Sequence, residues 1–170
     1  MIELHVLTPD DWAVWRELRL AALADAPHAF CARVSDWQGD GDREERWRAR
    51  LGIPGSHNVV ATLDGKPVGM VSGVPDPDSG RGVELISLWV DGGARGRGVG
   101  DRLVRAVERW ARQEHAKVMR LAVTPDNAHA VALYRRNGFR EAVRAGDVPQ
   151  DERGERVMTK ELGAPGEPPG

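Results

Sequence analysis

Residues 88–103 read LWVDGGARGRGVGDRL, and this segment is the most informative part of the chain. An apolar run typical of a buried strand leads into a glycine-rich turn, which is followed by residues with helical periodicity. Gly96, Gly98 and Gly100 allow the backbone to adopt conformations closed to other residues and to come close to a ligand. The first amides of a helix have no partner within it, and together with the helix dipole they bind anions. The stretch therefore predicts a strand, a turn and a helix that hold an anionic ligand.

Two common phosphate-binding motifs do not fit this turn. A Walker loop ends in Gly-Lys-Ser/Thr, whereas Gly100 is followed by Asp101 and Arg102. A dinucleotide fingerprint needs G-x-G-x-x-G, and its last position falls here on Asp101 or Leu103. A dinucleotide-binding domain also opens with such a unit, whereas this one lies in mid-chain. A glycine-rich turn without any ligand stays open as an alternative.

Strands and helices alternate on both sides of this unit. Strands are expected at 2–6, 58–63, 66–74, 83–90, 118–123, 139–144 and 156–162. Helices are expected from Thr8 through Leu23, at 43–51, at about 98–114, and from an Asn127 cap to Asn137. Asp64-Gly65 marks a tight hairpin. This order predicts a mixed sheet with helices on both faces.

The bulk properties place the chain among single-domain proteins. It has 170 residues, a formal net charge of -2, five scattered histidines and one cysteine, Cys31. One domain is expected at 1–162, followed by a flexible tail at 163–170. A single cysteine excludes an internal disulfide and suits a cytoplasmic location. The charge gives no reason to expect a nucleic acid or a membrane as partner. No apolar run approaches the roughly 18 residues of a membrane span. No metal is expected.

Two motifs together resemble the GNAT superfamily of acetyl-CoA-dependent N-acetyltransferases. The spacing Arg95-x-x-Gly98-x-Gly100 is similar to the family's R/Q-x-x-G-x-G/A motif. Residues 127–139, NAHAVALYRRNGF, are similar to its N-x-x-A-x-x-L-Y-x-x-x-G-F segment and follow in the family's order. The resemblance implies an α/β (α+β) GNAT fold, with a mostly antiparallel sheet of about seven strands, splayed in the middle, and about four helices on both faces. It also implies acetyl-CoA as co-substrate.

The resemblance assigns the residues of the coenzyme site. In the family the pyrophosphate lies on the glycine turn, and the pantetheine arm lies between two strands that splay apart. Leu88, Trp89 and Val90 would therefore contact the arm and the thioester through the main chain, and Asn127 would reach the arm from the other strand. The residues implied to hold the pyrophosphate are Arg95, Gly96, Arg97, Gly98, Val99, Gly100 and Asp101.

Two side chains are implied to take part in the transfer. Tyr134, the only tyrosine of the chain, falls on the family's tyrosine position and would protonate the leaving thiolate. Glu84 resembles the glutamate base of the histone-acetylating branch, and we expect it to share a face of its strand with Ile86 and Leu88 in an apolar cleft. A packed core tyrosine and a solvated or arginine-bonded glutamate stay open as alternatives.

The acceptor side is the least defined by the sequence. The resemblance implies that the first two helices and nearby loops line it, and the candidates are Arg16, Arg19, Pro27, His28, Phe30, Trp37 and Trp47. The acids between Asp36 and Glu45, with Asp76 and Asp78, either draw a polycation or form a solvated loop. Ala122 stands where enzymes that acetylate ribosomal-protein N-termini have a glutamate, which disfavours that reaction.

We expect the acceptor to be the primary amine of a small molecule, which attacks acetyl-CoA directly in a ternary complex. The alternatives are a protein acceptor, through a lysine or an N-terminus, and a non-catalytic module that senses acyl-CoA. Members of the family commonly form dimers, so a homodimer stays open as an alternative. The length of the acyl group is also left open by the resemblance.

Overall fold

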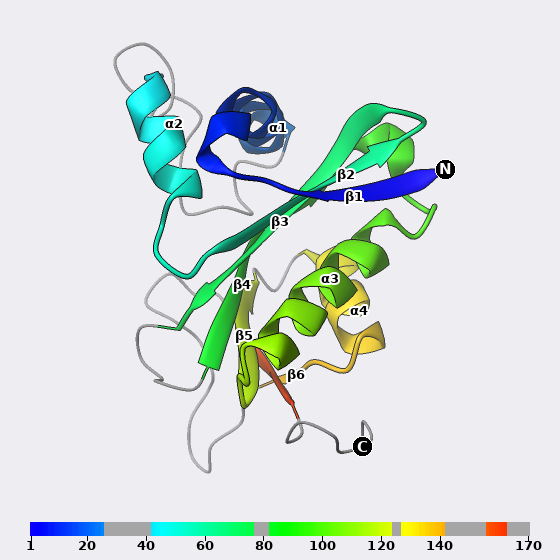
Figure 1. Ribbon diagram of the computed structural model, residues 1–170. Coiled ribbons are helices and arrows are strands. Elements are labelled where there is room, and N and C mark those ends of the chain that lie inside the picture. Colours follow the sequence, from blue (N-terminus) through cyan, green and yellow to red (C-terminus); the bar gives the residue numbers. More distant parts are fainter. Residues whose placement is uncertain (26–41, 77–81, 124–126, 142–155, 163–170) are drawn as a thin grey trace.

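The computed structural model describes residues 1–25, 42–76, 82–123, 127–141 and 156–162. Its strands are β1 (Ile2–Val6), β2 (His57–Leu63), β3 (Lys66–Pro75), β4 (Gly82–Val90), β5 (Val118–Val123), β6 (Arg140–Glu141) and β7 (Arg156–Glu161). Its helices are α1 (Trp12–Asp25), α2 (Glu44–Leu51), α3 (Val99–Gln113) and α4 (Ala128–Arg136), with short 3-10 turns at Pro9–Asp11 and Gly92–Ala94. The order of strands and helices is the one predicted (Figure 1).

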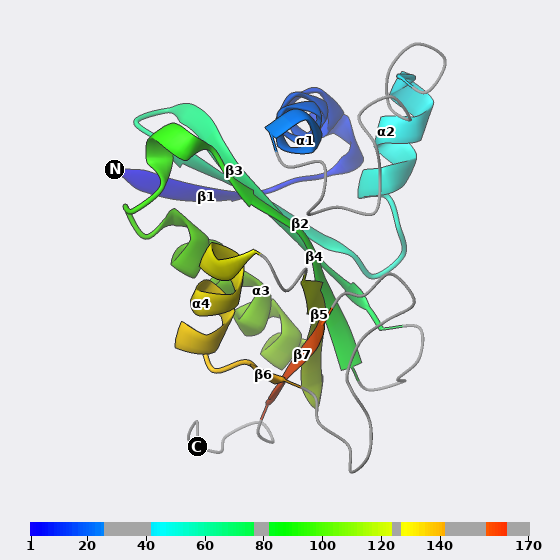
Figure 2. The same ribbon diagram turned by 180° about the vertical axis from the view of Figure 1, so that it is seen from behind.

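The strands form one seven-stranded sheet in the order β1-β2-β3-β4-β5-β7-β6. All neighbours are antiparallel except β4 and β5, which are parallel. Helices α1 and α2 cover one face, and α3 and α4 cover the other (Figures 1 and 2). The predicted mixed, mostly antiparallel sheet between two helical layers is therefore confirmed.

Each helical layer buries its own apolar core against the sheet. The buried stripe of α3 consists of Val99, Leu103, Val104, Val107 and Ala111, each at most 1% exposed. Trp110, on the same helix, is only half-buried and stacks on His57 with ring centroids 5.3 Å apart. On the opposite face, Trp15, Leu18 and Ala22 of α1 pack with Trp47 and Leu51 of α2.

The central parallel pair is short. Strands β4 and β5 are paired only at Gly82 with Val118, Val83 with Met119, and Glu84 with Arg120. Strand β4 continues to Val90, and no described strand pairs with this edge of it beyond Glu84. The sheet therefore splays in the middle, as predicted, and leaves peptide groups of β4 without sheet partners on that side.

A β-bulge interrupts β4 within the splayed part. Ser72 of β3 lies opposite Ile86, but Met70 lies opposite Trp89, so β4 has one more residue than β3 over this stretch. Ser87, inside the bulge, has a φ of 60°, which is rare for a residue with a side chain.

The bulge reverses which residues of β4 face which helical layer. Glu84 and Ile86 point to the α1 and α2 face, as the cross-strand register with β3 requires. Beyond the bulge, Trp89 packs on that face beside Met70, whereas Leu88 packs with the core under α3. The expectation that Leu88 shares a face with Glu84 and Ile86 is therefore wrong, because strict alternation holds only in a regular strand.

Several local predictions are also confirmed, with small shifts at the ends of elements. The side chain of Asn127 caps α4 by accepting the Ala130 amide at 3.3 Å, and Gly138 ends the helix with a φ of 95°. The Asp64-Gly65 hairpin has both residues at positive φ, 52° and 85°. The expected strand 139–144 is described only at Arg140–Glu141, and the predicted tail at 163–170 lies outside the described residues.

Candidate active site

The glycine turn lies open at the surface where β4 leads into α3. Gly96 and Gly98 have φ values of 80° and 83°, in the left-handed region that favours glycine. A Cβ added at either position would meet no atom within 4 Å. Helix α3 begins directly after Gly98, and no side chain caps it there. The first turn of α3 therefore has no side-chain cap, although Val99, its first residue, is itself 1% exposed, and an uncapped helix N-terminus is what an anion site requires.

At the third position of the motif, Gly100, glycine is favoured by close packing. A Cβ at Gly100 would lie 3.0 Å from Cδ2 of Leu133 in α4 and 3.8 Å from Cγ2 of Val90 in β4. Gly100 thus allows α3 to approach α4 and the end of β4 closely. Asp101 strengthens the same contact, since its carboxylate accepts two bonds from the Arg136 guanidinium and one from Asn137 Nδ2, all at 3.0 Å. Arg136 lowers the pKa of Asp101 below its ordinary value.

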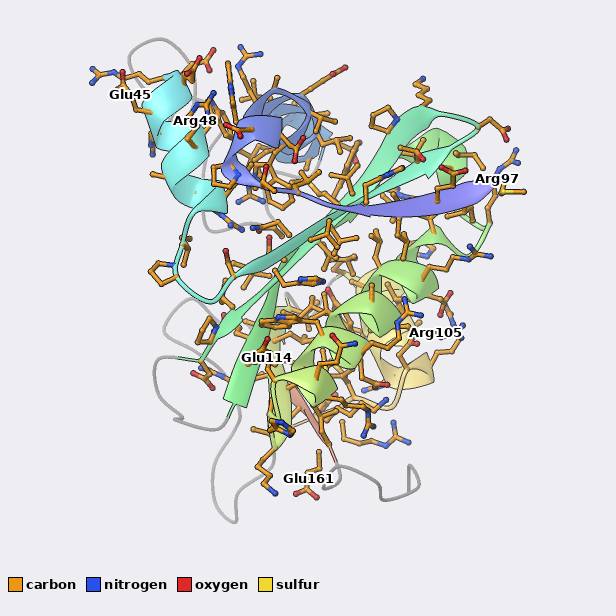
Figure 3. All side chains as sticks on the ribbon, in the orientation of Figure 1. Glu45, Arg48, Arg97, Arg105, Glu114 and Glu161 are labelled. Atoms are coloured by element: carbon orange, nitrogen blue, oxygen red, sulfur yellow. The ribbon has the colours of Figure 1, made fainter. Side chains whose placement is uncertain are left out.

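The arginines around the turn differ in what they contact. Arg95 donates from Nε to the carbonyl of Val90 and from Nη2 to Asp25, both at 3.1 Å, and so holds the turn against β4 and α1. Arg102 donates to the carbonyl of Ile2 at 3.1 Å. Arg97 projects from the tip of the turn, exposed and without a hydrogen bond or ion pair to the described residues (Figure 3). Of the three side chains, that of Arg97 is the one left to face a bound anion.

The end of β4 presents different side chains on its two sides. Trp89 is 7% exposed, and its indole N–H donates to Asp25 of α1 at 3.0 Å. Leu88 and Val90 are half-buried and pack with the core under α3. One edge of 88–90 is paired with β3, and the other edge, on the β5 side, has no described strand partner. This is the part of the strand for which main-chain contacts were predicted.

Tyr134 lies in α4 on the α3 side of the sheet. Its side chain is 6% exposed and meets the Phe139 ring edge-on, with ring centroids 5.9 Å apart. Burial raises the pKa of its hydroxyl above the ordinary value, so the phenol keeps its proton at neutral pH. No hydrogen-bond partner of this hydroxyl lies among the described residues. The tyrosine is thus packed in the core and also able to donate a proton.

Glu84 lies at the last paired position of β4 and β5, directly where the two strands diverge. Its carboxylate is 4.0 Å from Nη1 of Arg120, the residue opposite it on β5. The same Arg120 atom lies 3.7 Å from the buried carboxylate of Asp76. The alternative of an arginine-bonded glutamate is therefore present in the structure. Glu84 and Tyr134 come from the two opposite faces of the sheet.

The candidate acceptor residues of α1 and α2 are brought together in part. Asp42 accepts hydrogen bonds from Arg16 at 2.7 and 2.5 Å and from the Trp47 indole at 2.8 Å. Arg16 lowers the pKa of Asp42 to about 2. These three side chains hold the start of α2 against α1. The candidates outside the described residues are Pro27, His28, Phe30, Asp36, Trp37, Asp40 and Asp78.

One residue on this face was missed from the sequence. Arg50 of α2 reaches the sheet and donates to Asn58 Oδ1 at 3.2 Å, Ser72 Oγ at 3.0 Å and Ser87 Oγ at 3.3 Å. From the sequence, an arginine near the end of a polar helix is predicted to lie on the solvated face of that helix. The signal available was its position three residues after Trp47, which places both on one side of the helix.

The described residues hold no group of three or more His, Cys, Asp or Glu side chains that could bind a metal ion. No helix in the described ranges is long and apolar enough to cross a membrane.

The model of the acetyltransferase (GNAT) family matches residues 15–139. The L-2,4-diaminobutyric acid acetyltransferase of Streptomyces coelicolor is 34% identical over 77 residues, which are 45% of each protein. PaiA N-acetyltransferase from Thermoplasma acidophilum, solved in complex with coenzyme A, shares the fold with a TM-score of 0.76 at 17% identity, over 95% of this chain and 99% of that one. Ribosomal-protein-alanine N-acetyltransferase from Brucella melitensis has a TM-score of 0.69 at 27% identity, over 94% and 99%.

Three further curated relatives are matched over 38%, 45% and 38% of their lengths, so the match spans less than half of each. The family model, by contrast, covers well over half of this chain, from within α1 to Phe139, three residues beyond the end of α4. It includes both the glycine turn and the segment that contains Tyr134. The chain therefore belongs to the acetyltransferase (GNAT) family.

Proposed function

We propose that the chain is an acetyl-CoA-dependent N-acetyltransferase that acetylates the primary amine of a small molecule. The observation that supports this most strongly is the divergence of β4 from β5 after Glu84, next to the uncapped N-terminus of α3. A strand edge without partners and a helix N-terminus form adjoining sites, one for an amide-containing arm and one for a diphosphate. Acetyl-CoA contains both groups.

In this proposal the pyrophosphate of the coenzyme lies on the amides from Gly96 to Asp101, and Arg97 adds positive charge. The pantetheine arm lies along β4, where its amides pair with those peptide groups of 88–90 that bond neither to β3 nor, as the Val90 carbonyl does, to Arg95. The thioester then lies near the bulge, and the main-chain N–H groups there polarise its carbonyl. Asn127 is used as a helix cap, so any contact that it makes with the arm accompanies that role.

The amine must be neutral to attack the thioester, although free alkylamines have a pKa near 10. Glu84, on the α1 and α2 face, accepts the proton of the amine directly or through a water molecule. The nitrogen forms a bond to the acetyl carbon and loses its second proton to water as the carbon–sulfur bond breaks. Tyr134 protonates the thiolate from the opposite face and is reprotonated from solvent. The sheet thus separates the amine side of the reaction from the thiol side.

Two similar proteins suggest different acceptors. One is named for a small amino acid, L-2,4-diaminobutyric acid. The other is named for the alanine of a ribosomal protein and favours a protein N-terminus as the second candidate. Ala122 supports the small molecule, because the resemblance places a glutamate there in the ribosomal-protein enzymes.

Release of free coenzyme A from acetyl-CoA, measured with a panel of small amines and a panel of N-terminal peptides, tests this function. We expect at least one small amine to release thiol at a rate that saturates with both substrates. Acetylation of the peptides alone would favour the second candidate. Tight coenzyme binding without thiol release from any amine or peptide would instead indicate a sensing module.

Gly98→Trp should weaken coenzyme A binding at least about 100-fold, because the indole would cover amides that each contribute a charge-assisted hydrogen bond. Calorimetric titration with coenzyme A measures the change. Gly65→Trp is the matched control, since Gly65 also has positive φ and open space around its Cβ position but lies in the β2–β3 hairpin. Unchanged affinity in Gly98→Trp would contradict the assignment of the pyrophosphate site.

Tyr134→Phe should lower kcat on the order of 100-fold, the usual contribution of a general acid, and leave coenzyme affinity unchanged. Because burial raises the pKa of the hydroxyl, the proton stays bound as the pH rises past the ordinary tyrosine value. The wild-type rate should therefore show no loss up to about pH 10 from this group. An unaltered kcat in the variant would remove Tyr134 from the mechanism.

Glu84→Gln should lower kcat/KM at neutral pH by roughly 100-fold and much less at pH 9 to 10, where more of the amine is already neutral. Full pH profiles of kcat/KM measure this difference. Asp76→Asn is the control, because Asp76 lies near the same Arg120 atom. Equal losses in the two variants at every pH would mean that Glu84 acts only through Arg120.

A further inference from the structure

The guanidinium of Arg50 lies against the α1 and α2 face of the sheet, at the β4 bulge. Its three hydrogen bonds go to the side-chain oxygens of Asn58, Ser72 and Ser87. The group also lies 5.2 Å from the centroid of the Trp15 ring, over its face. A side chain from α2 thus crosses to the centre of the sheet and ends beside the residue with the strained backbone.

The polar partners of Arg50 within the described ranges are all uncharged. Arg16 and Arg48, on the same two helices, contact carboxylates of Asp42 and of Asp10 and Glu44. Arg50 has no such neutralising group in the described part of the chain. Burial, and then the positive charge of Arg19 nearby, lower the pKa of Arg50 to about 10. Arg50 is therefore still a cation at neutral pH, and a partly buried cation without a counter-ion is costly.

Hydrogen-bond donors also exceed acceptors at this place. A guanidinium has five N–H groups, and the three bonds of Arg50 leave others unused. The indole N–H of Trp15 is buried and has no acceptor among the described residues. A small group with acceptor oxygens and a negative charge would supply partners for the unused guanidinium N–H groups, and a carboxylate is such a group.

This donor-rich place adjoins the proposed transfer site. Ser87, which accepts a bond from Arg50, precedes Leu88, the first residue proposed to contact the thioester. Ile86 and Glu84 lie on the same face as Arg50's partner Ser72. A ligand held by Arg50 would therefore lie on the amine side of β4, between the guanidinium and the proposed base.

We propose that Arg50 binds a carboxylate of the acceptor, so that the substrates of this enzyme are small amino acids or similar amines with a carboxylate. This inference rests on the proposed function and narrows it to one chemical class. Arg50 orients the acceptor by its carboxylate and leaves the amine directed towards the thioester. The competing explanation is that Arg50 only fastens α2 to the sheet.

The first test uses three amino acids, β-alanine, 4-aminobutyrate and lysine. Each is compared with its own carboxamide as acceptor, in the wild type and in Arg50→Gln. In the wild type, kcat/KM should be at least about tenfold higher for the carboxylate member of a pair, as expected for a hydrogen-bonded ion pair. Arg50→Gln should bring this ratio close to one. Arg46→Gln, which removes an exposed arginine of the same helix, should keep the wild-type ratio.

The second test does not depend on turnover. The Nε–H resonance of Arg50, assigned by its loss in the charge-preserving variant Arg50→Lys, is followed by NMR during titration of the coenzyme A complex with each pair. We expect a saturable shift with the carboxylates and none with the carboxamides. Equal rates for both members of each pair, or a resonance that no carboxylate moves, would overturn the proposal.

The outcomes separate this proposal from the proposed function. Absence of coenzyme binding or of thiol release with any amine would contradict the function itself. Acetylation of carboxamides as fast as carboxylates, with tight coenzyme binding, would contradict only the role of Arg50. If Arg50→Gln does not fold, as judged by circular dichroism, the wild-type ratio and the NMR titration still decide.

Discussion

The structure depends on a short parallel contact in the middle of an otherwise antiparallel sheet. Strands β4 and β5 share only three residue pairs and separate after Glu84 and Arg120. Buried peptide groups seldom stay unpaired, so a strand edge exposed inside a protein implies a partner that is not part of the sheet. The helices that follow these two strands, α3 and α4, pack on each other through Gly100 and Leu133. The glycine turn is thereby placed directly beside the open strand edge.

The bulge in β4 gives the two faces of this opening different characters. Before Ser87 the strand directs Glu84 towards α1 and α2, and after it Trp89 is directed there while Leu88 faces α3. Asp25 then joins Trp89 and Arg95 to the end of α1, which fixes the end of β4 relative to the acceptor side. In the proposed mechanism the amine therefore approaches the thioester from one side of the sheet, and the thiolate is protonated from the other.

The charged groups near the site fall into two kinds. Asp101 with Arg136, and Asp42 with Arg16, are matched pairs that connect helices, and their contributions are to position and stability. Arg97 on the glycine turn and Arg50 of α2 form no ion pair with a described residue, and Asp64, the carboxylate near Arg97, pairs with the N-terminal ammonium. They lie on the two sides of the β4 end, one where a diphosphate is proposed and the other where an acceptor carboxylate is proposed. An arginine without an ion pair to a described residue thus lies beside each of the two proposed ligand contacts.

The sequence by itself determined what depends on neighbours along the chain. The apolar stripe of α3, the Asp64-Gly65 hairpin, the Asn127 cap and the glycines of positive φ follow from local periodicity and backbone preference. Tertiary structure alone decided the bulge at Ser87, because cross-strand register sets it, and hence the face that Leu88 occupies. It also decided that Gly100 serves packing and that Arg50 meets Asn58, Ser72 and Ser87. These contacts join segments far apart in the chain, where no local pattern reports which side chains meet.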